Sequence, residues 1–174
     1  MRYIKGTSDA GLCYEGSDFT NRGYVDSDFA GDLDKRKSTT CYVFTLAERA
    51  VSWVSKLQIV VALFTTKAEY MAGTQACKKA VWVKRLLEEL GHKQEKIILF
   101  YESQSALHIT KNPAFHSRTK HIRVQYYFVW EVVEDGNVDM LKIHTKENLA
   151  DVMTKPINTD KFVWSRSSYD LIKM

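Results

Sequence analysis

The hydrophobic period of the chain changes near residue 65, and this change restricts the folds that the chain can adopt. Residues 39–46 and 50–54 are rich in β-branched and aromatic residues and lie three residues apart, which predicts a β-hairpin, although its turn lacks a glycine. From Thr65 onward apolar residues recur at steps of three and four, which predicts a long amphipathic helix. Thr65 or Thr66 is expected to cap this helix, and Gly91 to end it. We therefore expect an antiparallel meander followed by a helix.

The second half of the chain is predicted to alternate strands and helices. Residues 96–101 form a continuous apolar run, which is typical of a strand buried in a parallel sheet, and Glu102 follows at its carboxyl end. Open α/β sheets carry their chemistry at such strand ends. Two helices, a last strand and a closing helix are then expected at residues 103–110, 124–133, 138–144 and 147–154.

Composition limits the class of protein. The 174 residues are 45% hydrophobic and 26% charged, which is ordinary for a globular domain and excludes disordered and fibrous classes. The formal net charge of +4 suits a polyanionic partner without requiring one. Three scattered cysteines are too few for a disulfide framework or a zinc cluster, which favours a reducing compartment. Because the longest apolar run is short and no signal peptide is evident, we expect a soluble, intracellular protein with no membrane partner.

The stretch 23–31, Gly-Tyr-Val-Asp-Ser-Asp-Phe-Ala-Gly, places two acids at alternate positions of a short predicted strand. Residues two apart on a strand point to the same face, so Asp26 and Asp28 are expected to share one. Two crowded carboxylates repel each other unless a cation or a basic partner lies between them, which makes this stretch a candidate metal site. The alternative is that Asp28 merely caps the turn before Gly31.

Acids stand at four predicted elements: Asp26 on the first strand, Glu69 in the first helix, Glu102 after the fourth strand and Asp151 in the closing helix. Together with the order of the elements, this placement resembles the ribonuclease H fold. The expected fold class is therefore α/β, with a mixed five-stranded sheet, three antiparallel strands and then parallel strands, flanked by helices.

Local motifs make this resemblance more specific. They are Tyr-Val-Asp-Ser-Asp-Phe-Ala-Gly-Asp (24–32), Arg-Lys-Ser-Thr (36–39), Ala-Glu-Tyr-Met-Ala (68–72), Ser-Gln-Ser-Ala (103–106), His-Ser-Arg-Thr-Lys-His-Ile (116–122) and Asn-Leu-Ala-Asp-Val-Met-Thr-Lys-Pro (148–156). In this order they resemble the ribonuclease H domain at the end of the Pol polyprotein of copia-type LTR retrotransposons. The resemblance runs from about residue 23 to residue 165.

The resemblance implies hydrolysis of the RNA strand of an RNA·DNA hybrid during reverse transcription. Two divalent ions about 3.5 to 4 Å apart would clamp the attacking water and the leaving oxygen. Mg²⁺ is the expected ion and Mn²⁺ the alternative, because hard cations take oxygen ligands, and no small-molecule cofactor is expected. Matched to the family's motifs, Asp26 is the central ligand, while Glu69 holds one metal and Asp151 the other. Glu102 bridges on the opposite side, and Asp28 is assigned no metal.

Two further positions bear on catalysis. His144 stands near the position at which related ribonucleases H carry a mobile histidine that helps the product to leave; a surface histidine at a strand end is the alternative. Glu102 stands where the family nearly always has Asp. One added methylene moves the carboxylate by roughly an ångström, and a misplacement of that size can cost about a hundredfold in rate.

Glu102 therefore leaves two functions open. One is a ribonuclease H, impaired to some degree. The other is an inactive nucleic-acid-binding or scaffold domain from a decayed element. An integrase-like activity on the same fold is a further rival, but Asp151 within Asn-Leu-Ala-Asp favours four acids over the triad typical of that class.

Residues 111–123 are the predicted contact for the RNA·DNA hybrid, because clustered basic side chains supply the phosphate contacts that dominate nucleic-acid affinity. The residues assigned to this role are Arg118, Lys120, His121 and Arg123. A solvated loop is the alternative.

The resemblance also divides the chain. Residues 1–22 are expected to be a leader left from the reverse transcriptase connection, residues 23–157 the ribonuclease H-like domain and residues 158–174 a surface tail. The reverse transcriptase portion of the same polyprotein is the expected protein partner. The expected location of the chain is the cytoplasm, in a virus-like particle, or the nucleus.

Overall fold

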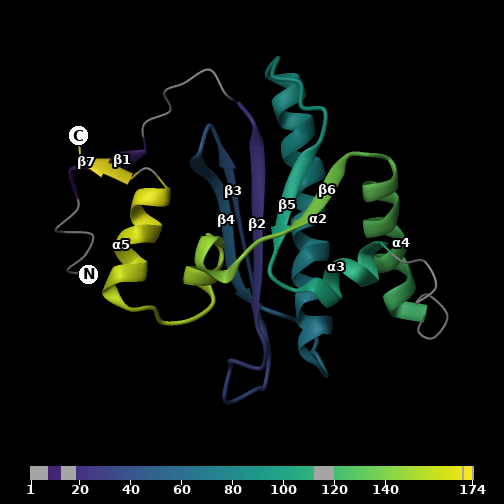
Figure 1. Ribbon diagram of the computed structural model, residues 1–174. Coiled ribbons are helices and arrows are strands. Elements are labelled where there is room, and N and C mark those ends of the chain that lie inside the picture. The colour runs from purple at the N-terminus through teal and green to yellow at the C-terminus, as the bar shows by residue number, and fades with distance from the viewer. Residues whose placement is uncertain (1–7, 13–18, 112–119, 170, 174) are drawn as a thin grey trace.

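The structure is a computed structural model that describes residues 8–12, 19–111, 120–169 and 171–173 (Figure 1). Its strands are β1 (Ala10–Leu12), β2 (Asn21–Asp28), β3 (Thr39–Leu46), β4 (Arg49–Leu57), β5 (Ile97–Tyr101), β6 (Val138–Lys142) and β7 (Leu171–Lys173). The helices are α2 (Thr65–Glu89), α3 (Gln104–Lys111), α4 (Lys120–Glu134) and α5 (Thr159–Ser168), with 3₁₀ turns η2 (Thr145–Glu147) and η3 (Asp151–Met153). Within these described ranges no helix is long and apolar enough to cross a membrane.

Five strands form one mixed sheet in the order β4-β3-β2-β5-β6. β2, β3 and β4 pair antiparallel, whereas β5 pairs parallel to both β2 and β6 (Figure 1). This confirms the predicted mixed sheet of three antiparallel strands followed by parallel ones. Because β5 pairs parallel to β2, the carboxyl ends of these two strands lie side by side at one edge of the sheet.

The β3–β4 hairpin is confirmed, but its turn has two residues instead of the expected three. Ala47 and Glu48 have φ angles of 49° and 65°, and positive φ at both central residues is the geometry of a type I′ hairpin turn. This turn suits the twist of the strands so well that it forms here without glycine. β4 also continues to Leu57, beyond the predicted end of the hairpin.

Helix α2 begins and ends close to the predicted positions, but its predicted cap is wrong. Phe64 is the N-cap residue and makes no side-chain capping bond, since both threonines already lie within the helix. The C-terminal prediction is confirmed. Gly91 has a φ of 85°, its N–H donates to the Glu88 carbonyl, and the His92 N–H donates to the Leu87 carbonyl.

Small residues let α2 lie close against the sheet. Ala68, Ala72 and Ala76 are fully buried. A Cβ atom on Gly73 would lie 2.7 Å from Cε1 of Tyr101, a distance that requires something to move. Glycine costs about 1 kcal/mol in a helix interior, so its place here is explained by the close packing of the Tyr101 ring.

The predicted closing helix over residues 147–154 is wrong, because this segment forms the separate turns η2 and η3. The fully buried side chain of Asn148 lies between them. Its Nδ2 donates to the Val25 carbonyl at 3.0 Å and its Oδ1 accepts the Ala150 N–H at 3.1 Å. Such bonds offer the backbone an alternative to a helix, which explains the interruption.

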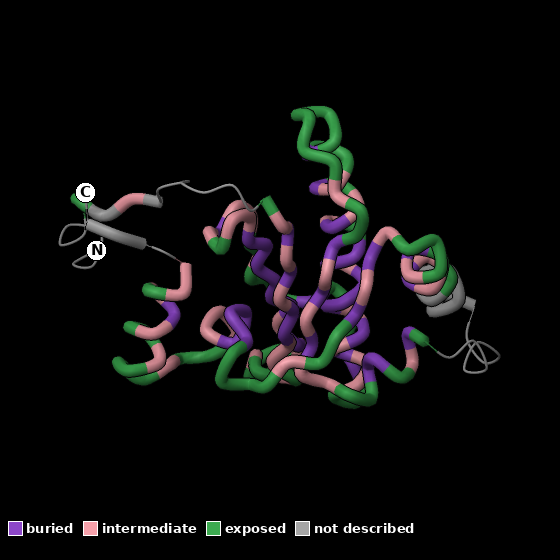
Figure 2. Tube along the Cα trace, turned by 45° about the horizontal axis from the view of Figure 1, so that its top comes forward, coloured by how far each residue is buried: buried purple, intermediate pink, exposed green. Residues whose placement is uncertain are grey.

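The C-terminal part contains elements that weak periodicity did not predict. Asn158 caps α5 by accepting the Lys161 N–H at 2.8 Å, and β7 pairs antiparallel to β1 in a separate two-stranded sheet. Figure 2 shows buried residues concentrated along the five-stranded sheet and α2, whereas α5 is mostly half-buried or exposed.

Candidate metal centre

Three acids that are far apart in the sequence meet at the carboxyl edge of the sheet. Asp26 lies near the end of β2, Glu102 directly follows the parallel strand β5, and Asp151 begins η3. One carboxylate oxygen of each lies within 4.8 Å of the others. Two oxygens bound to the same Mg²⁺ ion, at 2.0–2.1 Å each, are separated by at most roughly 4.2 Å. Adjacent oxygens on such an octahedral ion lie roughly 2.9 Å apart, so these three acids can share a cation once their side chains move closer together.

Asp26 and Asp151 are the two buried acids of this group, and Asp26 is the one on the central strand. Its side chain is 6% exposed, and its Oδ2 accepts a hydrogen bond of 2.9 Å from Thr154 Oγ1. Burial raises the pKa of Asp26 to about 6, and the charges of Glu102 and Asp151 add to the rise, while Thr154 and Lys155 oppose it. A cation in the group would reverse this repulsion.

Glu69 lies on α2, beside the three acids but outside the group whose oxygens meet. Its Oε2 atom is buried and has no hydrogen-bond partner among the described residues. Burial raises the pKa of Glu69 to about 8, followed by the nearby charges of Asp26 and Glu102, and the Ser27 hydroxyl opposes the rise. A buried, unpartnered carboxylate oxygen beside two further carboxylates fits a divalent cation with oxygen ligands.

Both oxygens of Glu102 accept hydrogen bonds from the segment that follows β6. Thr145 Oγ1 donates to Oε2 at 2.7 Å, and Asn148 Nδ2 donates to Oε1 at 2.9 Å. Each carboxylate oxygen has two lone pairs, so a hydrogen bond on each still leaves room for a metal. The longer Glu side chain is thus held in a defined position at the sheet edge.

Asp151 is held by its neighbours along the chain. The Lys155 ammonium lies 2.6 Å from Asp151 Oδ1, and this contact raises the pKa of Lys155. The carbonyl of Met153 accepts hydrogen bonds from Cys41 Sγ at 3.1 Å and from Ser55 Oγ at 2.8 Å. These two bonds fasten η3, and Asp151 with it, to the β3–β4 hairpin.

Two other predicted residues lie outside the acid group. The carboxylate of Asp28 packs over Gly31, where a Cβ atom would collide with it, which supports its interpretation as a turn residue. His144 is exposed at the start of η2, and its Nδ1 accepts the Lys146 N–H at 3.1 Å. A role of His144 in product release stays a prediction.

The predicted contacts to nucleic acid cannot be placed in the same way. Arg118 lies outside the described residues. Lys120, His121 and Arg123 belong to the first turns of α4, where the structure describes the backbone and not these side chains. Hybrid binding by this segment therefore stays a prediction.

Sequence reasoning missed the donors that hold the acids. Asn148, Thr154 and Lys155 all belong to the motif 148–156, so their position beside Asp151 could have identified them. Thr145 has no such signal, because it contacts Glu102 only through the pairing of β5 with β6.

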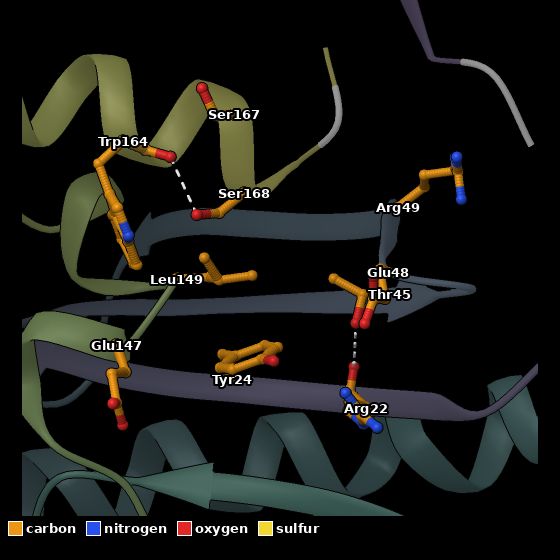
Figure 3. A pocket seen from close by; sticks show the side chains of 10 residues that line it. All are labelled: Arg22, Tyr24, Thr45, Glu48, Arg49, Glu147, Leu149, Trp164, Ser167 and Ser168. Atoms are coloured by element: carbon orange, nitrogen blue, oxygen red, sulfur yellow. Dashed lines mark hydrogen bonds between the residues drawn. The ribbon is translucent and has the colours of Figure 1, made fainter.

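A pocket of about 370 Å³ opens elsewhere, between the sheet and α5 (Figure 3). Tyr24 and Leu149 lie at its centre, Trp164 at one end and Arg22 and Arg49 at the other. None of the four acids lines it. The pocket is therefore separate from the candidate metal centre.

Comparison with known proteins agrees with this geometry, although no protein-family model matches the chain. The Retrovirus-related Pol polyprotein from transposon TNT 1-94 of Nicotiana tabacum is 49% identical over 162 residues, which are 93% of this chain and 12% of that polyprotein. The chain thus corresponds to a small part of its relative.

Two solved structures show the fold. LC11-RNase H1, isolated from compost, matches with a TM-score of 0.57 and 13% identity over 78% of this chain and 92% of that one. The prototype foamy virus protease-reverse transcriptase matches with a TM-score of 0.57 and 16% identity over 82% of this chain and 21% of that one. The chain therefore has the ribonuclease H fold that its motifs predicted, and over nearly its whole length it is similar to a segment of the retrovirus-related Pol polyproteins of transposons.

Proposed function

We propose that the chain is a metal-dependent ribonuclease H that cleaves the RNA strand of an RNA·DNA hybrid. The observation that carries this proposal is the meeting of Asp26, Glu102 and Asp151 at one sheet edge, with a buried, unpartnered oxygen of the Glu69 carboxylate nearby. Carboxylates crowded in this way are unfavourable without a cation. The ribonuclease H fold raises the probability of this chemistry by analogy.

The residues have distinct roles in this proposal. Asp26 would be the central ligand, and Glu69, Glu102 and Asp151 would complete the set of carboxylates that holds the ions. Divalent ions, Mg²⁺ or Mn²⁺, would supply an activated water and stabilise the leaving oxygen when bound. Thr154 holds the Asp26 carboxylate through its 2.9 Å hydrogen bond, so the central ligand does not have to be ordered when the substrate arrives.

An inactive binding or scaffold domain is the second candidate, and two features favour it. Glu102 is one methylene longer than the aspartate usual in the resembling family, and Lys155 forms an ion pair with Asp151. If either feature keeps the acids from binding metal, the fold would survive without turnover.

The partners and location in this proposal follow from the relatives. The similarity to a Pol polyprotein supports a link to a reverse transcriptase portion, and the foamy virus protein that shares the fold over 21% of its chain is a protease-reverse transcriptase. We assign the chain to the copia type on its own motifs. The substrate would be met in a cytoplasmic virus-like particle or in the nucleus.

The decisive experiment is cleavage of a labelled RNA strand in an RNA·DNA hybrid with Mg²⁺ or Mn²⁺. The natural chain, Asp26→Asn and Glu102→Asp are compared, with a DNA duplex of the same sequence as the control substrate. Metal-dependent cleavage of the hybrid alone, lost in Asp26→Asn, supports the enzyme. Cleavage by Glu102→Asp alone identifies Glu102 as the lesion, and hybrid binding without turnover by any of the three supports the scaffold.

A further inference from the structure

The position of Glu102 is set by the pairing of β5 with β6. The two strands are parallel with Tyr101 opposite Lys142, and the Ile143 N–H continues the ladder by donating to the Tyr101 carbonyl at 2.8 Å. Glu102 and Thr145 leave the sheet just beyond this bond. Their side chains therefore extend from adjacent strand ends, and the 2.7 Å hydrogen bond between them joins the two ends.

The backbone at Thr145 is itself held in place. Lys161 of α5 donates from Nζ to the carbonyls of Thr145, at 3.2 Å, and Lys146, at 3.0 Å. The His144 ring accepts the Lys146 N–H and so fixes the start of the η2 turn. The Thr145 hydroxyl is thus presented at a defined place, although its side chain is exposed.

A glutamate at this position needs such a partner more than an aspartate does. Glu has one more rotatable bond than Asp, and about half an ångström is the positional tolerance of a metal-binding constellation. Asn148 restrains one oxygen from the buried side, and Thr145 restrains the other from the solvent side. A bidentate hold of this kind fixes the plane of the carboxylate as well as its position.

We propose that Thr145 is a positioning residue that adapts this centre to glutamate at position 102. By holding Oε2 on the outer side, the hydroxyl keeps the carboxylate plane turned so that Glu102 can face the shared cation position with Asp26 and Asp151. A shorter aspartate would not reach Thr145 and would not need it. This inference rests on the proposed metal centre and adds to it a residue that no motif identified.

The test is Mn²⁺ affinity, measured by calorimetry on the whole chain without any substrate. Thr145→Val removes the hydroxyl at nearly constant shape and is expected to weaken binding about tenfold, as loss of an outer-shell partner does. Thr145→Ser keeps the hydroxyl and is expected to restore the affinity to within about twofold. In the Glu102→Asp background, Thr145→Val is expected to change the affinity by less than about twofold. Thr159→Val, at an exposed threonine that begins α5, is the matched control.

The outcomes distinguish the positioning role of Thr145 from the metal centre itself. An affinity that depends on Asp26 but is unchanged or raised by Thr145→Val would overturn the positioning role and leave the metal centre intact. The same holds if serine fails to restore binding or if the valine effect persists in the Glu102→Asp background. An affinity that Asp26→Asn does not lower would overturn the metal centre, and the inference with it.

Discussion

The two faces of the central sheet are built differently. On the α2 face, Val25, Leu99 and Tyr101 are almost wholly buried and pack against the small residues of the helix. On the α5 face, Ser165 is the one buried residue of α5 in the described structure, and a pocket of about 370 Å³ lies between this helix and Tyr24 (Figure 3). The first face is held by apolar packing and the second mainly by hydrogen bonds.

The acids are divided between these two halves of the molecule. Glu69 stands on α2, in the packed half, and Glu102 directly follows β5. Asp26 lies two residues from Tyr24 on β2, so it shares the α5 face, where Thr154 bonds it. Asp151 stands in η3, which is fastened through the Met153 carbonyl and through Thr154. Changes in the packed half should therefore lower the free energy of unfolding. Changes around η3 should lower the affinity for metal and leave the fold intact.

The largest effect is expected from Asp26→Asn, which should abolish cleavage without lowering the free energy of unfolding. Asp26→Asn should lower hybrid cleavage by more than about 10³-fold, because it removes the central ligand. It should not lower the free energy of unfolding of the metal-free protein, because it also removes a buried carboxylate that its neighbours repel. Cleavage kinetics and urea denaturation of the same preparation check both parts. Unimpaired cleavage would contradict the assigned role.

The packed face is tested by Gly73→Ala. The added Cβ meets the Tyr101 ring at 2.7 Å, and overpacking of this kind typically costs about 1–3 kcal/mol, which outweighs the better helix propensity of alanine. Urea denaturation measures the change in the free energy of unfolding. The Tyr101 hydroxyl oxygen lies even nearer to the added Cβ than the ring does. Gly73→Ala combined with Tyr101→Phe, which removes this oxygen, should therefore recover part of the loss. A more stable Gly73→Ala protein would show that this face is less tightly packed than described.

The electrostatic cost of the acid group is tested by pH. The pKa values of Asp26 and Glu69 are raised to about 6 and about 8, so the folded protein holds protons that the unfolded chain releases. The stabilisation is therefore complete at acid pH, below the unfolded pKa values, and is lost as pH rises through about 6 and then about 8. We expect the metal-free protein to lose at least about 1 kcal/mol between pH 5 and pH 8.

Added Mg²⁺ should flatten this pH dependence, because a bound cation favours the ionised acids. Thermal unfolding with EDTA and with Mg²⁺ across this range gives the comparison, and Glu69→Gln should remove the upper part of the slope. A metal-free protein that gains stability toward pH 8 would contradict the raised pKa values.

The smallest expected effect is on the hydrogen-bonded half. Ser55→Ala removes one of the two donors to the Met153 carbonyl. It should lower the free energy of unfolding by at most about 1.5 kcal/mol, because Ser55 is exposed and Cys41 still donates. The change in the free energy of Mn²⁺ binding should exceed the change in the free energy of unfolding, since η3 carries Asp151. Ser52→Ala, on the same strand β4, serves as the control. Equal changes in Mn²⁺ affinity in the two variants would contradict the role assigned to Ser55.

Sequence patterns predicted the packed half well and the other half poorly, and the reason is physical. The β3–β4 hairpin, α2 and β5 bury continuous or periodic apolar residues, which leaves a clear signal. The segment around Asn148 is shaped by a buried amide that reaches the Val25 carbonyl, a partner that no local period reveals. The same holds for Phe64 as a cap, where two adjacent threonines gave a misleading signal.

At the site, the motifs identified the acids but not their surroundings. Asp26, Glu102 and Asp151 were predicted to stand at element ends, and the sheet brings their oxygens together. That Thr145 would reach Glu102 depends on the register of β6 against β5 and on the length of one side chain. Neither can be read from residues 102 and 145 alone.

The hydrogen bond from Thr154 to Asp26 spans 128 positions of the chain, and this has a consequence for synthesis on the ribosome. At about 5–20 residues per second, the segment that carries Asp151 follows β2 by roughly 6 to 25 s. During that time β2, β3, β4 and α2 can already pair and pack, because their contacts are local. The nascent chain thus holds most of its sheet before it holds a complete set of acids, and the metal centre is among the last parts of the fold to be assembled.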